Sequence, residues 1–198
     1  MRNYRTLRLR LICGAIFAAT VASSVHVQAT IVRFATTWGN IDFRLYETAT
    51  PGHAANLLAY INDDRYDGTF VHRRAKKSGG AVDFVIQGGG FKILTSLLDQ
   101  PTGSGWTSVP TFGTVTNEPG ISNLRGTIAL AKVGSDPNSG TSQWIFNLDN
   151  NSFLESPPSN EFTVFGRIVG NGLTVADAIA GLERVVASFA SGAFGEIP

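Results

Sequence analysis

The sequence predicts a mostly β protein with two helices, folded as one domain. Segments of alternating apolar and polar residues recur along the chain, glycine and proline separate them, and only two segments have amphipathic-helix spacing. The chain has 198 residues, of which 43% are hydrophobic, enough for one core of ordinary size. The pattern fits a sandwich or a closed barrel and does not by itself choose between them.

Residues 1–29 are typical of an export signal. Four arginines make a basic start, an apolar run from Leu11 to Val21 follows, and Val27-Gln28-Ala29 is a small-residue site that signal peptidase accepts. The run is short for a membrane span, although a retained anchor is the alternative. We therefore expect cleavage after Ala29 and a periplasmic or secreted protein without stable membrane association.

The domain that remains, residues 30–198, is mildly acidic and has no cysteine. Residues 1–29 contain four arginines, no acidic residue and the only cysteine, Cys13. An acidic domain argues against nucleic acid as a partner. Without a thiol the domain has no disulfide, cysteine nucleophile or thiolate metal site. His53 and His72 lack ligand spacing, so we expect neither a metal nor a cofactor.

A hairpin is predicted at the start of the domain. Residues Thr30 to Ala35 and Ile41 to Leu45 alternate as strands with one buried face, and Trp38-Gly39-Asn40 between them is typical of a turn.

A helix is predicted to follow over residues 51–62. Thr50 is a candidate N-cap and Pro51 a proline in the first helical turn. The apolar residues after them recur at helical spacing. We expect His53 to be solvated on this helix and His72, further along, to be a buried structural residue.

Two short strands and a long surface excursion are predicted in the middle of the chain. The strands are Thr69 to His72 and Val82 to Gln87, and the segment from Arg74 to Gly80 between them is a polar, glycine-bearing loop. From Lys92 to Pro119 no periodicity is sustained, which indicates a functional loop over the surface.

Three strands and the second helix complete the prediction. The strands are Gly126 to Lys132, Ser142 to Leu148 and Phe162 to Val169, and a turn from Gly134 to Gly140 joins the first two. Residues Leu173 to Leu182 have the spacing of a short amphipathic helix.

Six segments of the domain resemble the cyclophilin family, in the family's order. They are Gly39-Asn-Ile41, Tyr66-Asp-Gly-Thr-Phe-Val-His-Arg73, Phe84-Val-Ile-Gln-Gly-Gly-Gly-Phe91, Gly126-Thr-Ile-Ala-Leu-Ala-Lys132, Thr141-Ser-Gln-Trp-Ile-Phe-Asn147 and Phe162-Thr-Val-Phe-Gly166. One segment alone would be weak, whereas the ordered set is a strong signal. The resemblance implies a closed eight-stranded antiparallel barrel capped by two α-helices, with a substrate groove on its outer face.

The same resemblance implies peptidyl-prolyl cis/trans isomerase activity and assigns the site. The catalytic arginine of the family follows the histidine of its Phe-His-Arg motif, which corresponds to Arg73. The implied substrate-binding residues are Phe84, Val85, Ile145, Phe153 and Leu154 for the apolar floor, Gln87 and Gln143 for hydrogen bonding, Ala131 and Lys132 for the strand that holds the peptide, and Phe162. The implied partners are proline-containing segments of unfolded or partly folded proteins, bound by a monomer.

The residue types suit this chemistry. Rotation of an X-Pro bond requires about 18 to 20 kcal/mol, and no covalent bond is made or broken. A guanidinium that donates to the pyramidal proline nitrogen makes a hydrogen bond that exists only in the transition state. Arginine stays ionised when desolvated and can address two acceptors at once.

Several departures from the family pattern leave alternatives open. Ile145 replaces a usual phenylalanine, Phe153 replaces the tryptophan of many members, and extra residues stand between Arg73 and Phe84. Arg74 is therefore the alternative catalytic residue, and a non-catalytic chaperone or scaffold that binds proline peptides is the rival function.

The C-terminal end leaves a third possibility, a member whose last strand is missing. The family closes its barrel with a strand after the second helix, and from Glu183 to Pro198 only Val185 to Phe189 is a weak candidate for it.

Overall fold

The computed structural model describes residues 29–77, 80, 82–93, 106–155 and 161–183. Strands and helices occur there in the order β1 (Ile31–Thr36), β2 (Gly39–Leu45), α1 (Pro51–Asn62), β3 (Arg73–Lys76), β4 (Asp83–Gly88), β5 (Phe91–Ile93), β6 (Trp106–Ser108), β7 (Thr127–Leu130), β8 (Trp144–Asn147), η2 (Ser152–Glu155), β9 (Val164–Val169) and α2 (Gly172–Ala180). The mostly β class with two helices is confirmed. The predicted export signal, except Ala29, lies outside the described residues.

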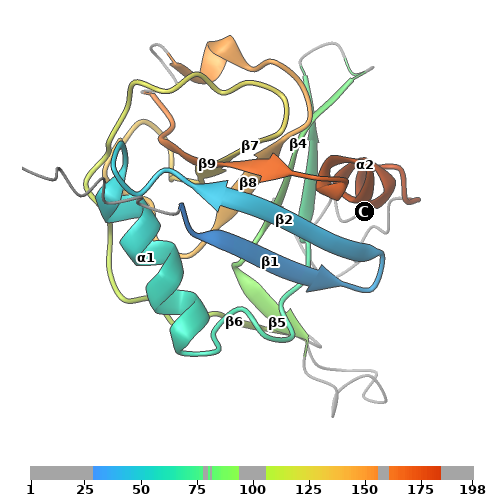
Figure 1. Ribbon diagram of the computed structural model, residues 1–198, viewed down its shortest axis with the longest axis horizontal. Coiled ribbons are helices and arrows are strands. Elements are labelled where there is room, and N and C mark those ends of the chain that lie inside the picture. Colours follow the sequence, from blue (N-terminus) through green and yellow to red (C-terminus); the bar gives the residue numbers. More distant parts are fainter. Residues whose placement is uncertain (1–28, 78–79, 81, 94–105, 156–160, 184–198) are drawn as a thin grey trace, which may run out of the picture.

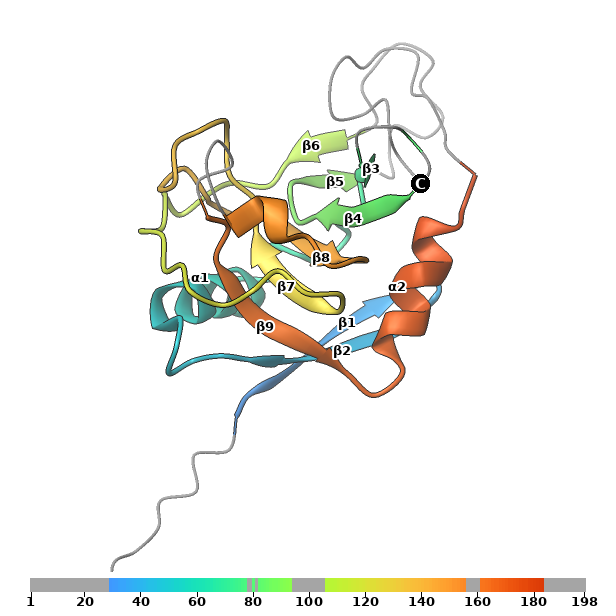
Figure 2. The ribbon, with the colours of Figure 1, turned by 90° about the horizontal axis from the view of Figure 1, so that it is seen from above.

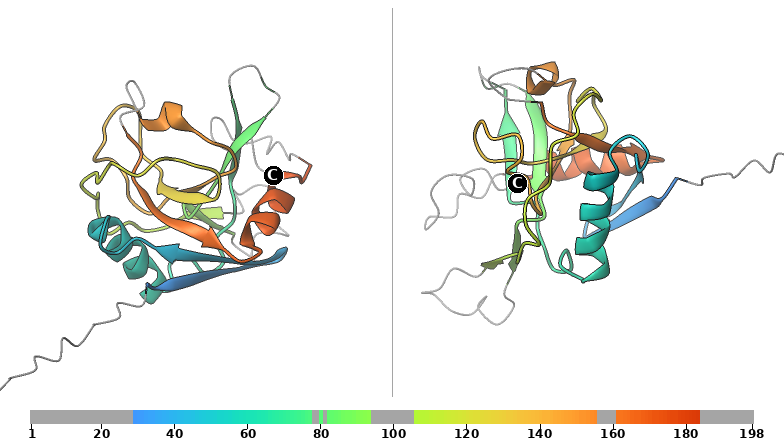
Figure 3. Two further views of the ribbon diagram at one scale, coloured as in Figure 1. Left: turned by 45° about the horizontal axis from the view of Figure 1, so that its top comes forward. Right: turned by 90° about the vertical axis from the view of Figure 1, so that its left-hand side faces the viewer.

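Seven strands form one curled antiparallel sheet in the order β1-β2-β9-β7-β8-β4-β3, and β5 and β6 form a separate pair. The curl of the sheet is visible in Figure 1 and from two further directions in Figure 3. The two edge strands of the seven-stranded sheet are β1 and β3. The candidate closing strand from Val185 to Phe189 lies outside the described residues, so the closed eight-stranded barrel stays a prediction.

The main core lies between the inner face of the sheet and the two helices, which stand at opposite ends of it (Figure 2). On β2 the buried residues alternate, as predicted for the hairpin: Ile41, Phe43 and Leu45 face inward. Leu57 of α1 and Ile179 of α2 pack against the same core. In the described part of the chain, neither helix is long and apolar enough to cross a membrane.

The first helix has the predicted bounds, but a distant residue caps it. The hydroxyl of Thr50 makes no hydrogen bond to the N-terminal N–H groups of α1. Glu118 accepts from the backbone N–H groups of Gly52 and His53 at 3.1 and 3.0 Å. Its carboxylate also lies 2.8 Å from Nδ1 of His53. The expectation that His53 is solvated is therefore wrong: the side chain is buried under this cap.

The strand predicted over Thr69 to His72 is misplaced. Thr69 forms only an isolated bridge with Lys92, and β3 instead covers Arg73–Lys76, of which all but Arg73 were predicted as loop. The polar composition of β3 concealed it, because its charged side chains find partners from distant segments. The second sheet, β5 with β6, lies almost entirely within the predicted surface excursion from Lys92 to Pro119 and was also missed.

Candidate active site

The register of the sheet places Arg73 in a line of residues on the outer face. Arg73 on β3 lies opposite Gln87 on β4, which in turn lies opposite Ile145 on β8. Ile145 lies opposite Ala129 on β7, and Ala129 lies opposite Val164 on β9. Residues directly opposite one another on paired strands point to the same face of a sheet. Five strands therefore present one continuous line, with a half-buried arginine at its end.

Arg74 points to the inner face. It lies opposite Ile86, which faces the main core. Its guanidinium donates to the backbone oxygens of Ala180 and, at 3.0 Å, Leu182, so it binds the C-terminal carbonyls of α2. Because adjacent strand residues face opposite ways, only Arg73 of the two arginines lies on the groove face.

A chain of hydrogen bonds links three of the predicted polar residues. Arg73 Nη1 donates to Oε1 of Gln87 at 3.4 Å, and Nε2 of Gln87 donates to Oε1 of Gln143 at 2.6 Å. The side-chain oxygen of Gln87 therefore holds the guanidinium, and Gln143 in turn holds the amide of Gln87.

Six of the predicted groove residues share one apolar cluster on the outer face, here called the outer-face cluster. Its buried members include Val85, Ile145 and Leu154, and Phe84, Ala131 and Phe162 pack against them. Phe153 stands at the edge, 45% exposed, with its ring 5.3 Å edge-on from that of Phe84. The backbone N–H of Ala131 donates to the oxygen of Gln143 at 2.8 Å, and Lys132 Nζ lies 4.5 Å from the Phe162 ring centroid. All ten predicted binding residues thus gather around the outer face.

A buried asparagine network supports this floor, and local sequence patterns hardly indicate it. Asn151 donates to the backbone oxygen of Phe84 at 2.9 Å and to Oδ1 of Asn147 at 2.8 Å. Asn147 in turn donates to Asn123 and Thr127, at 3.2 and 2.8 Å. The network ties η2, which carries Phe153 and Leu154, to β4. The only local signal was an asparagine ending the otherwise apolar β8, where asparagine is unfavourable.

His72 lies beneath the site as a fully buried side chain, as predicted. Its ring packs edge-on against Phe91 with centroids 4.8 Å apart. Burial lowers its pKa from 6.5 to about 4; a hydrogen bond with Gln143 opposes this shift and the charge of Arg73 adds to it. The imidazole is therefore neutral at pH 7 and is not a proton donor for chemistry there.

This burial predicts a loss of stability in mild acid. The unfolded state binds the proton near pH 6.5 and the folded state only near pH 4, so the stabilisation is present above 6.5 and declines as the pH falls toward 4. Between pH 7.5 and 5 the free energy of unfolding should drop by about 2 kcal/mol from this group. Urea unfolding measures it. In the variant His72→Gln the free energy of unfolding should fall by about 2 kcal/mol less over that pH interval than in the unmodified protein. The same pH dependence in both proteins would contradict the assignment.

The arrangement combines a fixed cationic donor with an apolar floor. Among the described residues no group of three histidine, cysteine or carboxylate side chains could hold a metal ion. The site can bind an apolar ring and polarise one neighbouring acceptor, which suits a reaction in which no bond is broken.

Comparisons with known proteins agree with this geometry. The family model described as cyclophilin type peptidyl-prolyl cis-trans isomerase/CLD matches residues 31–189. A peptidyl-prolyl cis-trans isomerase of Acinetobacter baylyi is 34% identical over 168 residues, which are 84% of this chain and 80% of that protein. Peptidyl-prolyl cis-trans isomerase B of Escherichia coli is 31% identical, over 85% of this chain and 92% of that protein.

Solved structures support the fold. The crystal structure of a cyclophilin type peptidyl-prolyl cis-trans isomerase from Cryptosporidium parvum matches with a TM-score of 0.59 and 22% identity, over 86% of this chain and 92% of that chain. With the family match over residues 31–189 and relatives above 30% identity, the chain belongs to the cyclophilin-type peptidyl-prolyl cis-trans isomerase family.

Proposed function

We propose that this cyclophilin-type isomerase accelerates rotation about X-Pro bonds in exported proteins as they fold, with Arg73 as its catalytic residue. The observation that carries the proposal is the line from Arg73 through Gln87 to Gln143 beside the outer-face cluster. It supplies a fixed guanidinium next to a surface that fits a proline ring.

The proposed mechanism follows from the physics of the amide bond. The proline ring rests on Phe84, Ile145 and Leu154 and excludes water there. As the bond twists, amide resonance is lost and the proline nitrogen gains a free lone pair, to which Arg73 donates. This hydrogen bond lowers the barrier of about 18 to 20 kcal/mol, because it is absent from both planar isomers.

The other residues bind the substrate in this proposal. Gln87 holds the guanidinium of Arg73, and Gln143 lies within reach of the peptide backbone. Backbone groups of Ala131 and Lys132 hold the peptide, Phe153 extends the apolar floor beside Phe84, and Phe162 packs against the outer-face cluster. We propose that the protein acts as a monomer, with Val185 to Phe189 closing the barrel; the match of the family model to residue 189 supports this closure.

A proteolysis-coupled assay on an Ala-Pro peptide tests the catalytic proposal. Cleavage requires the trans isomer, so an isomerase accelerates the slow phase in proportion to its concentration. The rival, a non-catalytic binder of proline peptides, would bind the same peptide in a titration and leave the slow phase unchanged.

Export is a separate proposal with its own test. A basic start, an apolar run and a small-residue site coincide only before Thr30, so the secreted or periplasmic protein should begin at that residue. N-terminal sequencing of protein recovered from the exported fraction decides it. Membrane-bound protein that still begins with Met1 would instead support a retained anchor.

A further inference from the structure

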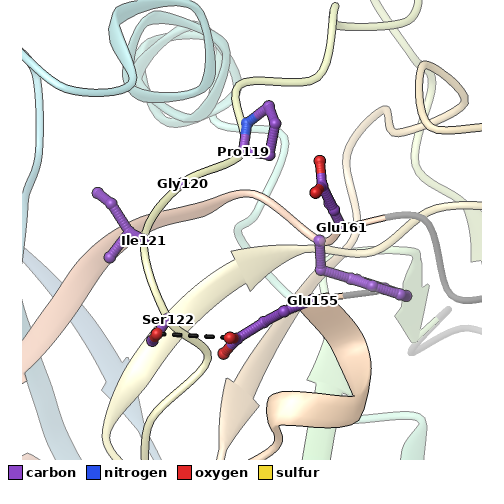
Figure 4. Close-up of a pocket in the computed structure, with 7 residues that line it drawn as sticks. Pro119, Gly120, Ile121, Ser122, Glu155 and Glu161 are labelled. Carbon is purple, nitrogen blue, oxygen red and sulfur yellow. Dashed lines mark hydrogen bonds between the residues drawn. The ribbon is translucent and has the colours of Figure 1, made fainter. Parts of the chain in front are cut away.

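A pocket of about 200 Å³ opens beside the proposed substrate groove. One wall is the segment from Pro119 to Ser122, and the other is formed by Glu155 of η2 and by Glu161 and Phe162 before β9. Figure 4 shows both glutamates on the same side of the Pro119 to Ser122 segment. Apart from Phe162, the residues that line this pocket have no role in the proposed isomerase mechanism.

The pocket and the groove share residues. Phe162 and Ile121 line the pocket and also pack against the outer-face cluster. The backbone N–H of Phe162 donates to the oxygen of Leu154, in the groove floor, at 2.9 Å. A peptide extended over Phe162 advances about 3.3 Å per residue, so it would reach the pocket roughly two to four residues from its proline.

The two carboxylates are held by different means. Oε1 of Glu155 accepts from the backbone N–H of Asn123 at 2.7 Å, and Oε2 accepts from the hydroxyl of Ser122 at 3.4 Å. These bonds fix the carboxylate and leave lone pairs for a ligand.

Glu161 is constrained through its backbone. It adopts a φ of 51°, uncommon for a residue other than glycine, and its carbonyl oxygen accepts from Nδ2 of Asn117 at 2.8 Å. Within the described part of the chain, its exposed carboxylate makes no hydrogen bond or ion pair.

The charges around the pocket sum to a negative value. Lys132, over the ring of Phe162, adds one positive charge against the two carboxylates. Burial lowers the pKa of Lys132, with the charge of Asp136 opposing this shift. The pocket therefore combines apolar lining residues, among them Ile121 and Phe162, with net negative charge. This combination complements a side chain that has an apolar stem and a cationic head.

We propose that this pocket binds the side chain of an arginine or lysine two to four residues from the target proline, so that the enzyme prefers X-Pro bonds near basic residues. The proposal rests on the proposed function, because the substrate backbone lies in the same groove. The aliphatic stem packs on Ile121 and Phe162, and the cationic head donates to Glu155 and Glu161.

Peptides that differ only in one charge test this preference. Arginine is scanned from two to four positions on either side of the proline, and each peptide has a twin with citrulline, which is neutral and of the same shape. NMR exchange spectroscopy gives kcat/KM and titration gives Kd, neither of which needs a coupling protease. At one of these positions the arginine peptide should have a kcat/KM about three- to tenfold higher and a Kd about three- to tenfold lower than its citrulline twin. Both differences should shrink as the salt concentration rises.

Variants locate the effect. Glu161→Gln should reduce the arginine preference, and Glu155→Gln with Glu161→Gln should abolish it. In the described residues the side chain of Glu161 makes no hydrogen bond or ion pair, so that single variant keeps the test valid if loss of Glu155 disturbs folding. Asp177→Asn on α2 removes the same charge from a residue that does not line the pocket, and it should leave the preference intact.

The outcomes separate the two proposals. Acceleration of the citrulline peptides without any arginine preference would overturn the pocket proposal and leave the proposed function standing. If the protein accelerates isomerisation of none of the peptides, the proposed function is overturned. The Kd values of each arginine and citrulline pair would still test the pocket proposal. An arginine preference that survives in the double variant would also overturn the pocket proposal.

Discussion

Replacing Arg73 with alanine is expected to lower kcat/KM by about two to three orders of magnitude. This is the loss measured for removal of one preorganised donor, about 2.7 to 4 kcal/mol of transition-state stabilisation. Binding of a ground-state proline peptide should change much less, because the lone pair on the proline nitrogen becomes available only in the twisted state. The coupled assay and a peptide titration measure the two effects separately.

Two further arginine variants define the chemistry and the register. Arg73→Lys should be nearly as damaging, because an ammonium has the charge without the planar fork. Arg74→Ala should lower the melting temperature, since Arg74 binds the C-terminal carbonyls of α2, while kcat/KM of the folded protein stays near normal. Near-normal activity of Arg73→Ala would contradict the mechanism, and a catalytic loss at Arg74 instead would contradict the register.

Replacing Gly89 with alanine is expected to destabilise the protein by about 3 kcal/mol. Gly89 has a φ of 77°, and a Cβ there would lie 2.8 Å from the backbone oxygen of Ser142 and 2.8 Å from the ring of Trp144. A backbone oxygen cannot move aside as a flexible side chain can, so the strand end that carries Gln87 and Gln143 would be forced apart. Urea unfolding gives the change in free energy.

Gly68 provides a matched control for this variant. Its φ is 72°, nearly that of Gly89, but a Cβ there would meet nothing within 4 Å. Gly68→Ala should therefore lose only the conformational penalty, about 1 kcal/mol. The difference between the two variants measures the steric overlap alone, and equal losses would show that Gly89 is needed only for its backbone conformation.

Local sequence patterns were sufficient to predict a strand or helix where that element has one apolar and one polar face. The hairpin of β1 with β2 and the helix α1 could be predicted because their buried residues recur with periods of two and about 3.6. The ordered motifs likewise identified the family and named residues that the structure gathers on one face of the sheet.

Local sequence patterns gave the wrong prediction where a polar side chain is hydrogen-bonded by residues distant in the sequence. The charged side chains of β3 suggested a loop, yet Arg74 binds the end of α2, 106 positions away in the sequence. His53 was expected in solvent because nothing near it in sequence shows Glu118, 65 positions away, whose carboxylate covers it.

The sequence by itself determined the class and the family, because periodicity and motif order are properties of the chain. It could not determine which of two adjacent arginines lies on the groove face, because a shift of one residue in strand pairing exchanges the two faces. Only the tertiary structure decided this, through the register of Arg73 with Gln87 and of Arg74 with Ile86. Tertiary structure likewise brings Glu155 and Glu161 beside the segment from Pro119 to Ser122, where they line one pocket.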